Sequence, residues 1–417
     1  MNAVLTPPRA PSALGRPLLD DAYRANPYPT YAELRAAGPL HWSDEFFGGA
    51  WLLTQHEDID AVLKDPRFSA VRTGGWVTAS QHERSEFTPF QQLFARALLF
   101  LDPPDHTRLR RLLNAGFRAE ALQALAPRIE QIARELLDAV DHGQPFDFIQ
   151  AVARPLPVRV ISAMMDIPAE HHANLLLWSD DLADFLGAAE PSHDQTRRAQ
   201  VSTLAMGRLF EQLATQRRQT PGDDLISRLV EGEANGDIQS QAEMLAQCVM
   251  LLFAGHETTR NALGNGLLAL LQHPDQWQLL REEPEFLPSA VRELLRFDSP
   301  VQYTGRRVVT ELELHGQRLK RGDSVVALIG AANRDPSRYE DPDTLDITRR
   351  EGSSLTFGSG PHVCIGAALT RLETETVLRE LMRRWDRLAW LDAQPHWLGS
   401  PLYRSLTQLT VLPVAHP

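Results

Sequence analysis

The chain has 417 residues, with 42 basic and 54 acidic side chains and a formal net charge of −12. Its 43% hydrophobic and 23% charged residues are typical of a globular protein with a large core, which excludes wholesale disorder. The acidic balance argues against nucleic-acid binding, which requires a basic face. The cysteines, Cys248 and Cys364, are too few for a disulfide framework, and no apolar run approaches the ~20 residues that span a bilayer. We therefore expect a cytoplasmic protein without a membrane anchor.

The first predicted elements are a flexible arm and a short strand pair. Residues 1–17 are rich in proline, and we expect them to form a flexible N-terminal arm. Alternating apolar residues at 40–42 and 51–54 predict two short strands. From Asp105 to about Asp141 the apolar residues recur at helical spacing, and further helix follows to about Arg218.

The clearest predicted helix begins at Ser240 and ends at His273, before Pro274. Ser240 and Glu243 have the spacing of a capping box, in which each side chain accepts a hydrogen bond from a free backbone N–H group. At 1.5 Å per residue this helix would be roughly 50 Å long. Residues 245–254 are apolar on nearly all sides, so we expect the helix to be buried.

Strand-like alternation returns at 306–314 and 324–328, and a second strong helix is predicted from Cys364 to about Trp385. Helix dominates this pattern, and sheet is minor. No repeat or low-complexity linker marks a domain boundary. We therefore predict a mainly α fold with a minor β region, in a single domain of residues 1–417.

The segment 357–366, Phe-Gly-Ser-Gly-Pro-His-Val-Cys-Ile-Gly, carries the strongest chemical signal. Glycines let the main chain approach a bound group closely, and a cysteine at a helix start has its thiolate stabilised by the helix dipole and by unpaired N–H groups. Such a thiolate suits an axial iron ligand, which makes Cys364 a candidate metal ligand. The alternative is a buried free cysteine, and Cys248, inside an apolar helix, fits that alternative.

The long helix contains the sequence Ala-Gly-His-Glu-Thr-Thr at 254–259. We expect Thr258 to donate a hydrogen bond to the Ala254 carbonyl, one turn earlier, and so to bend the helix. The bend would open a groove in which Thr258 and Glu257 relay protons. A His-Glu pair also begins the helical zinc-protease signature, but Arg260 stands where the second histidine is required, so the sequence excludes that site.

Charged side chains elsewhere are less specific. Glu293 and Arg296 lie one helical turn apart, which is usually a solvated ion pair, although apolar neighbours indicate partial burial here. Cationic side chains can bind carboxylates, and singly they are more often surface residues. Four are candidates for this role: His106, Arg110, Arg306 and His362.

Taken in order, these motifs resemble those of the cytochrome P450 superfamily of haem-thiolate monooxygenases, in particular its soluble bacterial members. The resemblance extends from Asn26 to the last strands, and it rests on the cysteine loop, the 254–259 motif and the Glu293–Arg296 pair. Residues 332–336 also look like the segment that precedes the haem loop in that family. The resemblance implies a P450 fold, with haem b between the long central helix and the helix after the cysteine loop.

The resemblance also implies roles for individual residues. Cys364 would be the proximal iron ligand, and Thr258 with Glu257 would be the alcohol–acid pair that delivers protons during oxygen activation. Glu293 and Arg296 would have a structural role near the haem. The haem propionates would be held by His106, Arg110, Arg306 and His362.

The implied function is a monooxygenase that activates dioxygen with two electrons, supplied ultimately by NAD(P)H through a ferredoxin and its reductase. It would hydroxylate or epoxidise a small, largely apolar organic substrate, free or tethered to a carrier protein, in secondary metabolism. A basic face formed by Arg108, Arg111, Arg349 and Arg350 would dock the acidic ferredoxin. We expect a monomer that binds neither nucleic acid nor membrane.

Two other functions remain open for the same fold. One is a peroxide-driven haem-thiolate peroxygenase, and the other is a non-catalytic haem-binding recruiter. Relatives of the first kind typically lose the acid–alcohol pair, and a recruiter has no need of it. This chain retains the pair in Glu257 and Thr258, so the sequence favours the monooxygenase.

The walls of the substrate pocket are predicted by position alone. They are the segments 68–100, 178–191, 301–303 and 402–403, together with Leu252. Four apolar side chains in or near these segments would suit a pocket but are equally explained as core packing: Leu98, Phe100, Trp178 and Phe185. Thr370 departs from the alanine that many relatives have after the cysteine.

Overall fold

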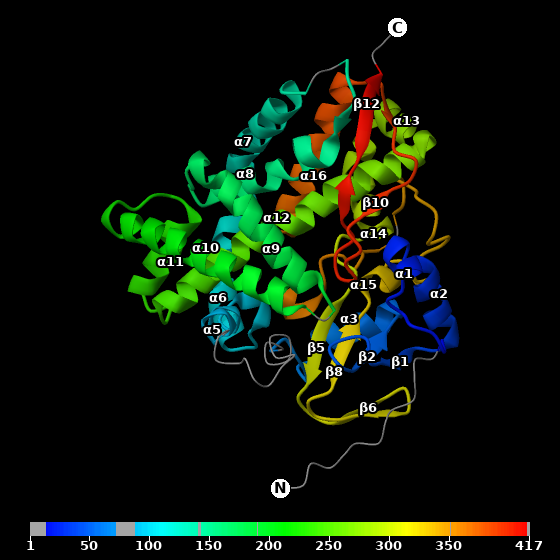
Figure 1. Ribbon diagram of the computed structural model, residues 1–417, viewed down its shortest axis with the longest axis horizontal. Coiled ribbons are helices and arrows are strands. Elements are labelled where there is room, and N and C mark those ends of the chain that lie inside the picture. Colours follow the sequence, from blue (N-terminus) through cyan, green and yellow to red (C-terminus); the bar gives the residue numbers. More distant parts are fainter. Residues whose placement is uncertain (1–13, 72–87, 141–142, 190, 351, 415–417) are drawn as a thin grey trace.

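The computed structural model describes residues 14–71, 88–140, 143–189, 191–350 and 352–414. Helices make up most of the molecule, and the largest sheet lies at one end beside the N-terminal helices (Figure 1). No helix in these described ranges is long and apolar enough to cross a membrane. The predicted mainly α architecture with a minor β region is confirmed.

The helices follow one another along the whole chain. They are α1 (Asp21–Ala25), α2 (Tyr28–Ala37), α3 (His56–Lys64), α5 (Thr88–Phe94), α6 (Asp105–Asn114), α7 (Ala119–Asp138), α8 (Pro155–Met164), α9 (His172–Gly187), α10 (His193–Gln219), α11 (Leu225–Ala234), α12 (Gln241–Gln272), α13 (Pro274–Glu282), α14 (Leu287–Phe297), α15 (Ile329–Ala332) and α16 (Ala367–Arg384). Short 3-10 or π segments join several of them: η1 (Leu98–Phe100), η2 (Ala115–Phe117), η3 (Ile149–Ala153), η4 (Ala169–His171), η5 (Pro284–Phe286) and η6 (Gly360–His362).

The strands form one larger sheet and three small ones. The strands are β1 (Leu40–Ser43), β2 (Ala50–Leu53), β3 (Phe68–Ser69), β4 (Phe146–Asp147), β5 (Thr304–Val308), β6 (Leu312–Leu314), β7 (Gln317–Leu319), β8 (Ser324–Ala327), β9 (Arg387–Trp390), β10 (His396–Trp397), β11 (Leu406–Gln408) and β12 (Thr410–Val414). The larger sheet has the order β1-β2-β8-β5-β3, and the predicted pair β1–β2 is antiparallel. The small sheets are β4-β12-β9, β10-β11 and β6-β7.

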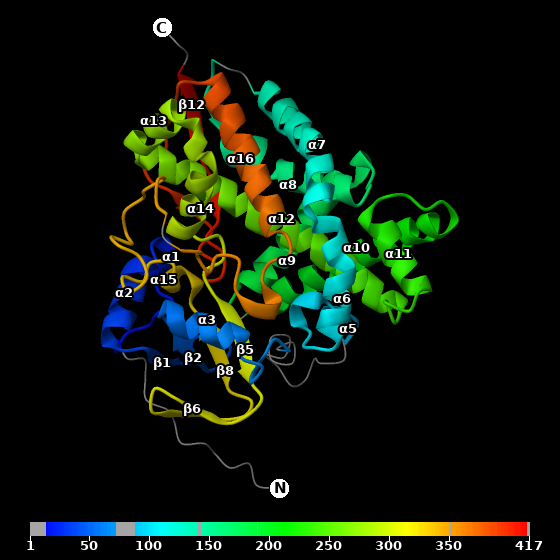
Figure 2. The same cartoon turned by 180° about the vertical axis from the view of Figure 1, so that it is seen from behind.

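Helix α12 runs through the centre of the molecule, as its apolar sequence predicted. Its first half, up to Phe253, packs in a core cluster with α9, α10 and α11. Its second half, from Ala262, packs in another cluster with α7, α14 and α16. Figure 2, which shows the molecule from behind, places α16 beside α14 and α7. The 254–259 motif therefore lies where the two clusters meet.

The capping box at the start of α12 is only half formed. The Ser240 hydroxyl accepts a hydrogen bond from the Glu243 backbone N–H, as predicted. The Glu243 carboxylate instead accepts from the Gln239 N–H and pairs with Arg108 of α6, at 2.7 Å and 3.0 Å. The Glu243 carboxylate therefore binds Arg108 in place of the Ser240 backbone N–H that the sequence spacing predicted as its partner.

The continuous helix predicted from Asp105 to Asp141 is wrong in its middle. The chain forms α6 and α7, separated by the 3-10 turn η2 that contains Gly116. A Cβ at Gly116 would lie 2.2 Å from a Leu225 methyl carbon, so α11 packs directly against this bend. Apolar spacing does not reveal such a bend, because the apolar face continues on both sides of it.

The N-terminal arm is only partly covered by the structure. Residues 1–13 lie outside the described ranges, so the predicted flexibility is not tested there. Arg16, within the predicted arm, forms ion pairs with Asp20 and Glu33. The end of the arm therefore contacts α2 through Glu33, and the flexibility of residues 1–17 stays a prediction.

Candidate active site

Thr258 and Cys364 line the same internal cavity, although they lie far apart in the sequence. Thr258 comes from the middle of α12, and Cys364 from the loop just before α16. Their neighbours in the cavity wall include Leu99, Val301, Thr304, Arg306, Ile329, Phe357, His362 and Thr370. The fold thus brings the two strongest sequence motifs together around one space.

The loop before α16 is shaped by its glycines. Gly358 and Gly360 have φ values of +70° and +69°, in the left-handed region that favours glycine. A Cβ at Gly360 would lie 2.8 Å from the Leu63 carbonyl oxygen, so only glycine fits against α3 there. The Cys364 N–H donates to the Phe357 carbonyl at 2.8 Å, which closes the loop and turns the thiol toward the cavity.

The surroundings of the Cys364 thiol shift its pKa in opposite directions. Burial raises the pKa of this thiol, whereas the backbone N–H groups of Gly366 and Ala367 and the charges of Arg110 and Arg371 lower it. The stabilising groups predicted for a thiolate are present, but burial outweighs them. A metal cation bonded to sulfur would supply the missing charge. Cys248 is fully buried in α12, and burial raises its pKa to about 12.

The middle of α12 presents Thr258 to the cavity but turns Glu257 away from it. The Thr258 hydroxyl donates to the Ala254 carbonyl at 2.9 Å, as predicted. The Glu257 carboxylate is fully buried behind it and accepts from Arg260 at 3.3 Å and Asn261 at 3.1 Å. Burial raises the pKa of Glu257, and the charge of Arg260 opposes that rise. The two predicted proton carriers are therefore adjacent in sequence but face different surroundings.

Polar contacts continue from Glu257 to α9. Arg260 also lies 3.6 Å from Asp180, which pairs with Arg154 at the start of α8. The neighbouring residue of α9, Ser179, is hydrogen-bonded to His256 Nδ1 at 2.7 Å. Burial lowers the pKa of His256 to about 3, so this imidazole is neutral at pH 7. Helix α12 is thus joined to α8 and α9 by polar groups beside its proton-carrying segment.

Of the four candidate propionate-binding residues, Arg306 and His362 line the cavity, and His106 and Arg110 contact the loop residues His362 and Val363 beside it. His106 stacks on His362 with ring centroids 4.0 Å apart, and Arg110 donates to the Val363 carbonyl at 2.6 Å. Arg306 is 6% exposed, and burial lowers its pKa to about 10. In the described ranges, none of His106, Arg110 and Arg306 forms a salt bridge, and His106 Nε2 is buried without a hydrogen-bond partner. Arg306 is the buried cation of this group, and it feels the charge of Asp102 but forms no salt bridge with it, so a bound anion would stabilise it further.

These groups fit an iron porphyrin. The Cys364 sulfur is a ligand for iron, the cationic edge suits two propionates, and apolar residues such as Leu99, Val301 and Ile329 suit the faces of the ring. A protein-only metal centre is not supported, because no group of three or more His, Cys, Asp or Glu side chains in the described ranges is arranged to hold a metal ion.

The cavity walls correct part of the sequence prediction. Phe100 and Phe185 are 1% and 2% exposed and pack in the core with Phe90 and Phe94, which favours the core-packing alternative for them. Leu98 and Trp178 pack against the same core cluster. Leu99, between two of these residues, lines the cavity instead, together with the predicted Val301.

Thr370 is a lining residue that the sequence marked only as a family departure. Its hydroxyl lies 3.2 Å from that of Thr259 on α12, which joins α16 to the central helix. Its position on α16, two turns after Cys364, was the available signal that it faces the cysteine side of the site.

The predicted basic docking face is also partly wrong. Arg108 is paired with Glu243 and Asp105, and the Arg349 side chain is 7% exposed and paired with Glu293. Neither is available at the surface. Arg350 is exposed, and the Arg111 side chain is 72% exposed although it pairs with Asp237.

Comparisons with known proteins give the same picture. Residues 69–389 match the family model described as cytochrome P450. The chain is 36% identical to the cytochrome P450 monooxygenase PikC of Streptomyces venezuelae, covering 96% of this chain and 94% of that protein. It is 35% identical to the polyketide biosynthesis cytochrome P450 PksS of Bacillus subtilis strain 168, covering 93% and 96%. The crystal structure of P450BioI in complex with hexadec-9Z-enoic acid ligated acyl carrier protein superimposes with a TM-score of 0.87 at 33% identity, covering 94% and 100%.

Proposed function

The chain belongs to the cytochrome P450 family and is a P450 monooxygenase, and on that premise we propose that it hydroxylates or epoxidises a small, largely apolar secondary metabolite. The observation that carries the proposal is the shared cavity of Thr258 and Cys364 with its cationic edge. Haem b, when bound, supplies the redox chemistry that reduces dioxygen and transfers one oxygen atom to the substrate. Cys364 would hold its iron, and His106, Arg110, Arg306 and His362 its propionates.

The residues of α12 would donate and accept protons in this reaction, and the neighbouring apolar wall would keep bulk water out. Thr258 presents its hydroxyl at the cavity wall, where its oxygen can accept a hydrogen bond while its proton is donated to Ala254. Once the bond to Ala254 opens, the hydroxyl can donate that proton to a reacting oxygen atom. Glu257, one residue earlier, has a raised pKa and so keeps its proton to higher pH than an exposed glutamate does. A small rotation of its side chain away from Arg260 would bring this proton to the Thr258 side. The apolar wall around Leu99 and Val301 would exclude bulk water.

The test of haem ligation is spectroscopic. The reduced protein with carbon monoxide should give the Soret band of a thiolate-ligated haem. Cys364→Ser should abolish that band, whereas Cys248→Ser, a matched change at the buried cysteine of α12, should leave it unchanged. A thiolate-type band that survives Cys364→Ser would refute the assignment.

We further propose that electrons arrive from NAD(P)H through a ferredoxin reductase and a ferredoxin, which docks near the Cys364 loop. Four exposed arginines lie on or beside this face: Arg111, Arg292, Arg350 and Arg371. An acidic donor would be attracted to such a face, so its reduction rate should fall with salt. Arg371→Glu should slow reduction more than Arg197→Glu, a reversal on the distant helix α10. Equal rates would remove this docking surface.

The peroxide-driven and non-catalytic alternatives can be separated by turnover. The Glu257–Thr258 pair supports dependence on dioxygen, because peroxide brings its own protons. Product formed with a ferredoxin system and dioxygen would support the monooxygenase. Product formed only with hydrogen peroxide would favour the peroxygenase, and no product under either condition would favour the recruiter.

The substrate class rests on relatives. PksS is named for polyketide biosynthesis, and P450BioI binds a fatty acyl chain on a carrier protein. We propose a substrate of this general kind, either free or carrier-bound, that is oxidised by a monomeric enzyme in the cytoplasm. Candidate compounds should be screened by the shift of the haem absorption band. If the carrier-bound form of a compound shifts the band at a lower concentration than the free acid does, the substrate is the carrier-bound form.

A further inference from the structure

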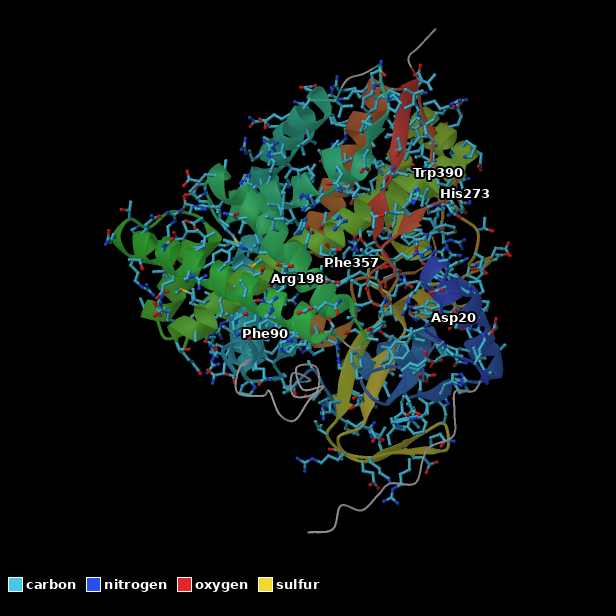
Figure 3. All side chains as sticks on the ribbon, viewed as in Figure 1. Asp20, Phe90, Arg198, His273, Phe357 and Trp390 are labelled. Carbon is cyan, nitrogen blue, oxygen red and sulfur yellow. The ribbon has the colours of Figure 1, made fainter. Side chains whose placement is uncertain are left out.

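Five arginines line one small cleft beside the Cys364 loop. The cleft has a volume of about 80 Å³, which is room for one small ion and far too little for a substrate. It lies between α14, residues 349–350 and 352–357, and α16; Figure 2 shows α14 and α16 side by side. Its charged lining residues are Arg292, Glu293, Arg296, Arg349, Arg350 and Arg371. Phe357, labelled near the centre of Figure 3, forms part of the wall.

Two of the arginines form the back wall of the cleft, and their N–H groups already have hydrogen-bond partners. Arg296 donates to both carboxylate oxygens of Glu293, at 2.7 Å and 2.8 Å, and to the carbonyls of Asn333 and Pro342. Arg349 donates to Glu293 at 3.2 Å and to nearby carbonyls. Their donors point inward, so these two side chains and Glu293 fix the shape of the cleft rather than offer it free charge.

The other three arginines are compensated less fully, because Glu375 acts on Arg292 and Arg371 through its charge but pairs with neither of them in a salt bridge among the described residues. Arg292, Arg350 and Arg371 form no salt bridge with any residue in the described ranges, and Glu293 is the only carboxylate among the described residues that line the cleft. The Arg371 guanidinium lies over the Phe357 ring, 5.1 Å from its centroid, which holds it in place. Burial lowers the pKa of Arg371, and the nearby charge of Arg292 lowers it further, whereas Glu375 and Cys364 oppose the shift. The cleft therefore gathers like charges that repel one another until an anion binds.

We propose that this arginine cleft is a binding site for a dianionic tetrahedral oxyanion, of which inorganic phosphate is the simplest. The three guanidiniums without a salt bridge come from three separate places, namely α14, Arg350 and α16. Donors that converge from several directions match oxygens at the corners of a tetrahedron better than the two coplanar oxygens of one carboxylate. Ser353 and Ser354 belong to the same wall, and the Ser354 hydroxyl is hydrogen-bonded to that of Thr356 at 3.0 Å.

Phosphate in the cleft would compete with the electron donor. This consequence rests on the proposed function, because it requires an acidic ferredoxin to dock on the same face. A bound dianion would cancel most of the positive charge that attracts such a donor. Phosphate should therefore slow reduction more than chloride does at equal ionic strength.

Binding is tested first, on the ferric holoenzyme and without turnover. Inorganic phosphate is titrated at constant ionic strength, and its binding is followed by the broadening of its 31P NMR line. We expect saturable broadening that Arg292→Gln and Arg371→Gln each weaken about tenfold or more, since each removes hydrogen bonds to a charged group. Arg379→Gln is the matched control, because Arg379 is exposed on α16 but does not line the cleft. The thiolate-type Soret band of each variant checks that its haem site is intact.

Three outcomes would overturn the proposal or its consequence. Equal phosphate affinity in the wild type and in both cleft variants would overturn the site. Acetate that displaces phosphate at a matched concentration of negative charge would overturn the preference for a tetrahedral dianion. Reduction by ferredoxin that is equally fast in phosphate and in chloride would overturn the competition and leave the site standing. A protein that ferredoxin does not reduce at all would contradict the proposed function while the NMR result remained valid.

Discussion

The Arg260 guanidinium lies 3.3 Å from the Glu257 carboxylate inside the protein, one helical turn further along α12. Arg260 occupies the position at which a zinc protease would carry its second histidine. Here it holds the acid that the sequence assigned to proton transfer. The ion pair therefore controls both the orientation and the proton affinity of Glu257.

The first prediction concerns the pH dependence of turnover. Burial raises the pKa of Glu257 and Arg260 opposes this rise, so removal of the Arg260 charge should raise the pKa further. If protonated Glu257 donates the proton, turnover falls as pH rises through its pKa. Arg260→Gln should then move this falling limb to higher pH, whereas Arg260→Lys, which keeps the charge, should leave it near the wild-type position. The measurement is kcat against pH, and a limb that Arg260→Gln does not move would contradict the assignment.

Glu257→Gln should lower kcat by about 100-fold, the usual range for loss of a general acid. The haem spectrum should not change, because Glu257 does not line the cavity. A variant with nearly wild-type turnover would show that protons reach Thr258 by another path.

The second prediction concerns haem retention. Arg306 is buried without a salt bridge in the described part of the chain, and its lowered pKa reflects that burial. Arg306→Gln should weaken haem binding by roughly 1.5–3 kcal/mol, the contribution of a hydrogen bond to a charged group. The rate of haem transfer to an excess of a haem-free globin measures this loss. Arg307→Gln, on the opposite face of β5, is the control and should transfer haem at the wild-type rate.

The third prediction concerns the buried pair of Glu293 and Arg296. Their side chains are 2% and 3% exposed, so either charge alone would be costly. Glu293→Gln would leave both Arg296 and Arg349 without their carboxylate and should lower the free energy of unfolding by about 3–5 kcal/mol. Urea denaturation measures the change. Glu130→Gln, in the exposed pair with Arg134, should cost no more than about 1 kcal/mol.

The fourth prediction concerns Glu373, a fully buried carboxyl on α16. Neither oxygen has a hydrogen-bond partner among the described residues, and burial raises the pKa well above its usual value. Between the unfolded and folded pKa values the unfolded chain releases this proton and the folded chain keeps it. Stability should therefore fall by about 1.4 kcal/mol per pH unit over that window.

Glu373→Gln removes this dependence, so its stability relative to the wild type should rise steadily from about pH 4.5 upward. Glu380→Gln should behave in the opposite way. Burial raises the pKa of Glu380, but hydrogen bonds from Arg383 and Arg134 lower it overall, so its charged form stabilises the fold above that pKa. Urea unfolding checks the signs, from pH 5 to pH 8 for Glu373→Gln and from pH 5 down to about pH 3 for Glu380→Gln. The second range is lower because the lowered pKa of Glu380 places its pH dependence below the unfolded value. A pH-independent difference at Glu373 would show that its carboxyl is solvated or paired.

The elements predicted from the sequence were those with strong local causes. The apolar stretch of α12 and the pair β1–β2 were confirmed because burial and alternation leave a direct mark on the residue pattern. The Thr258–Ala254 hydrogen bond was predicted because its two partners lie on the same helix. The break at Gly116 was missed because Leu225, which packs against it, belongs to another helix.

The sequence by itself determined the helical character of the chain and the cysteine loop, since backbone preferences and glycine conformations act over a few residues. The tertiary structure alone decided which charges are buried together. It paired Arg108 with Glu243, turned Glu257 away from the cavity and left Arg292, Arg350 and Arg371 around one cleft. The physical reason is that electrostatic and desolvation energies depend on distance and burial in space, and residues far apart in the sequence set both of them.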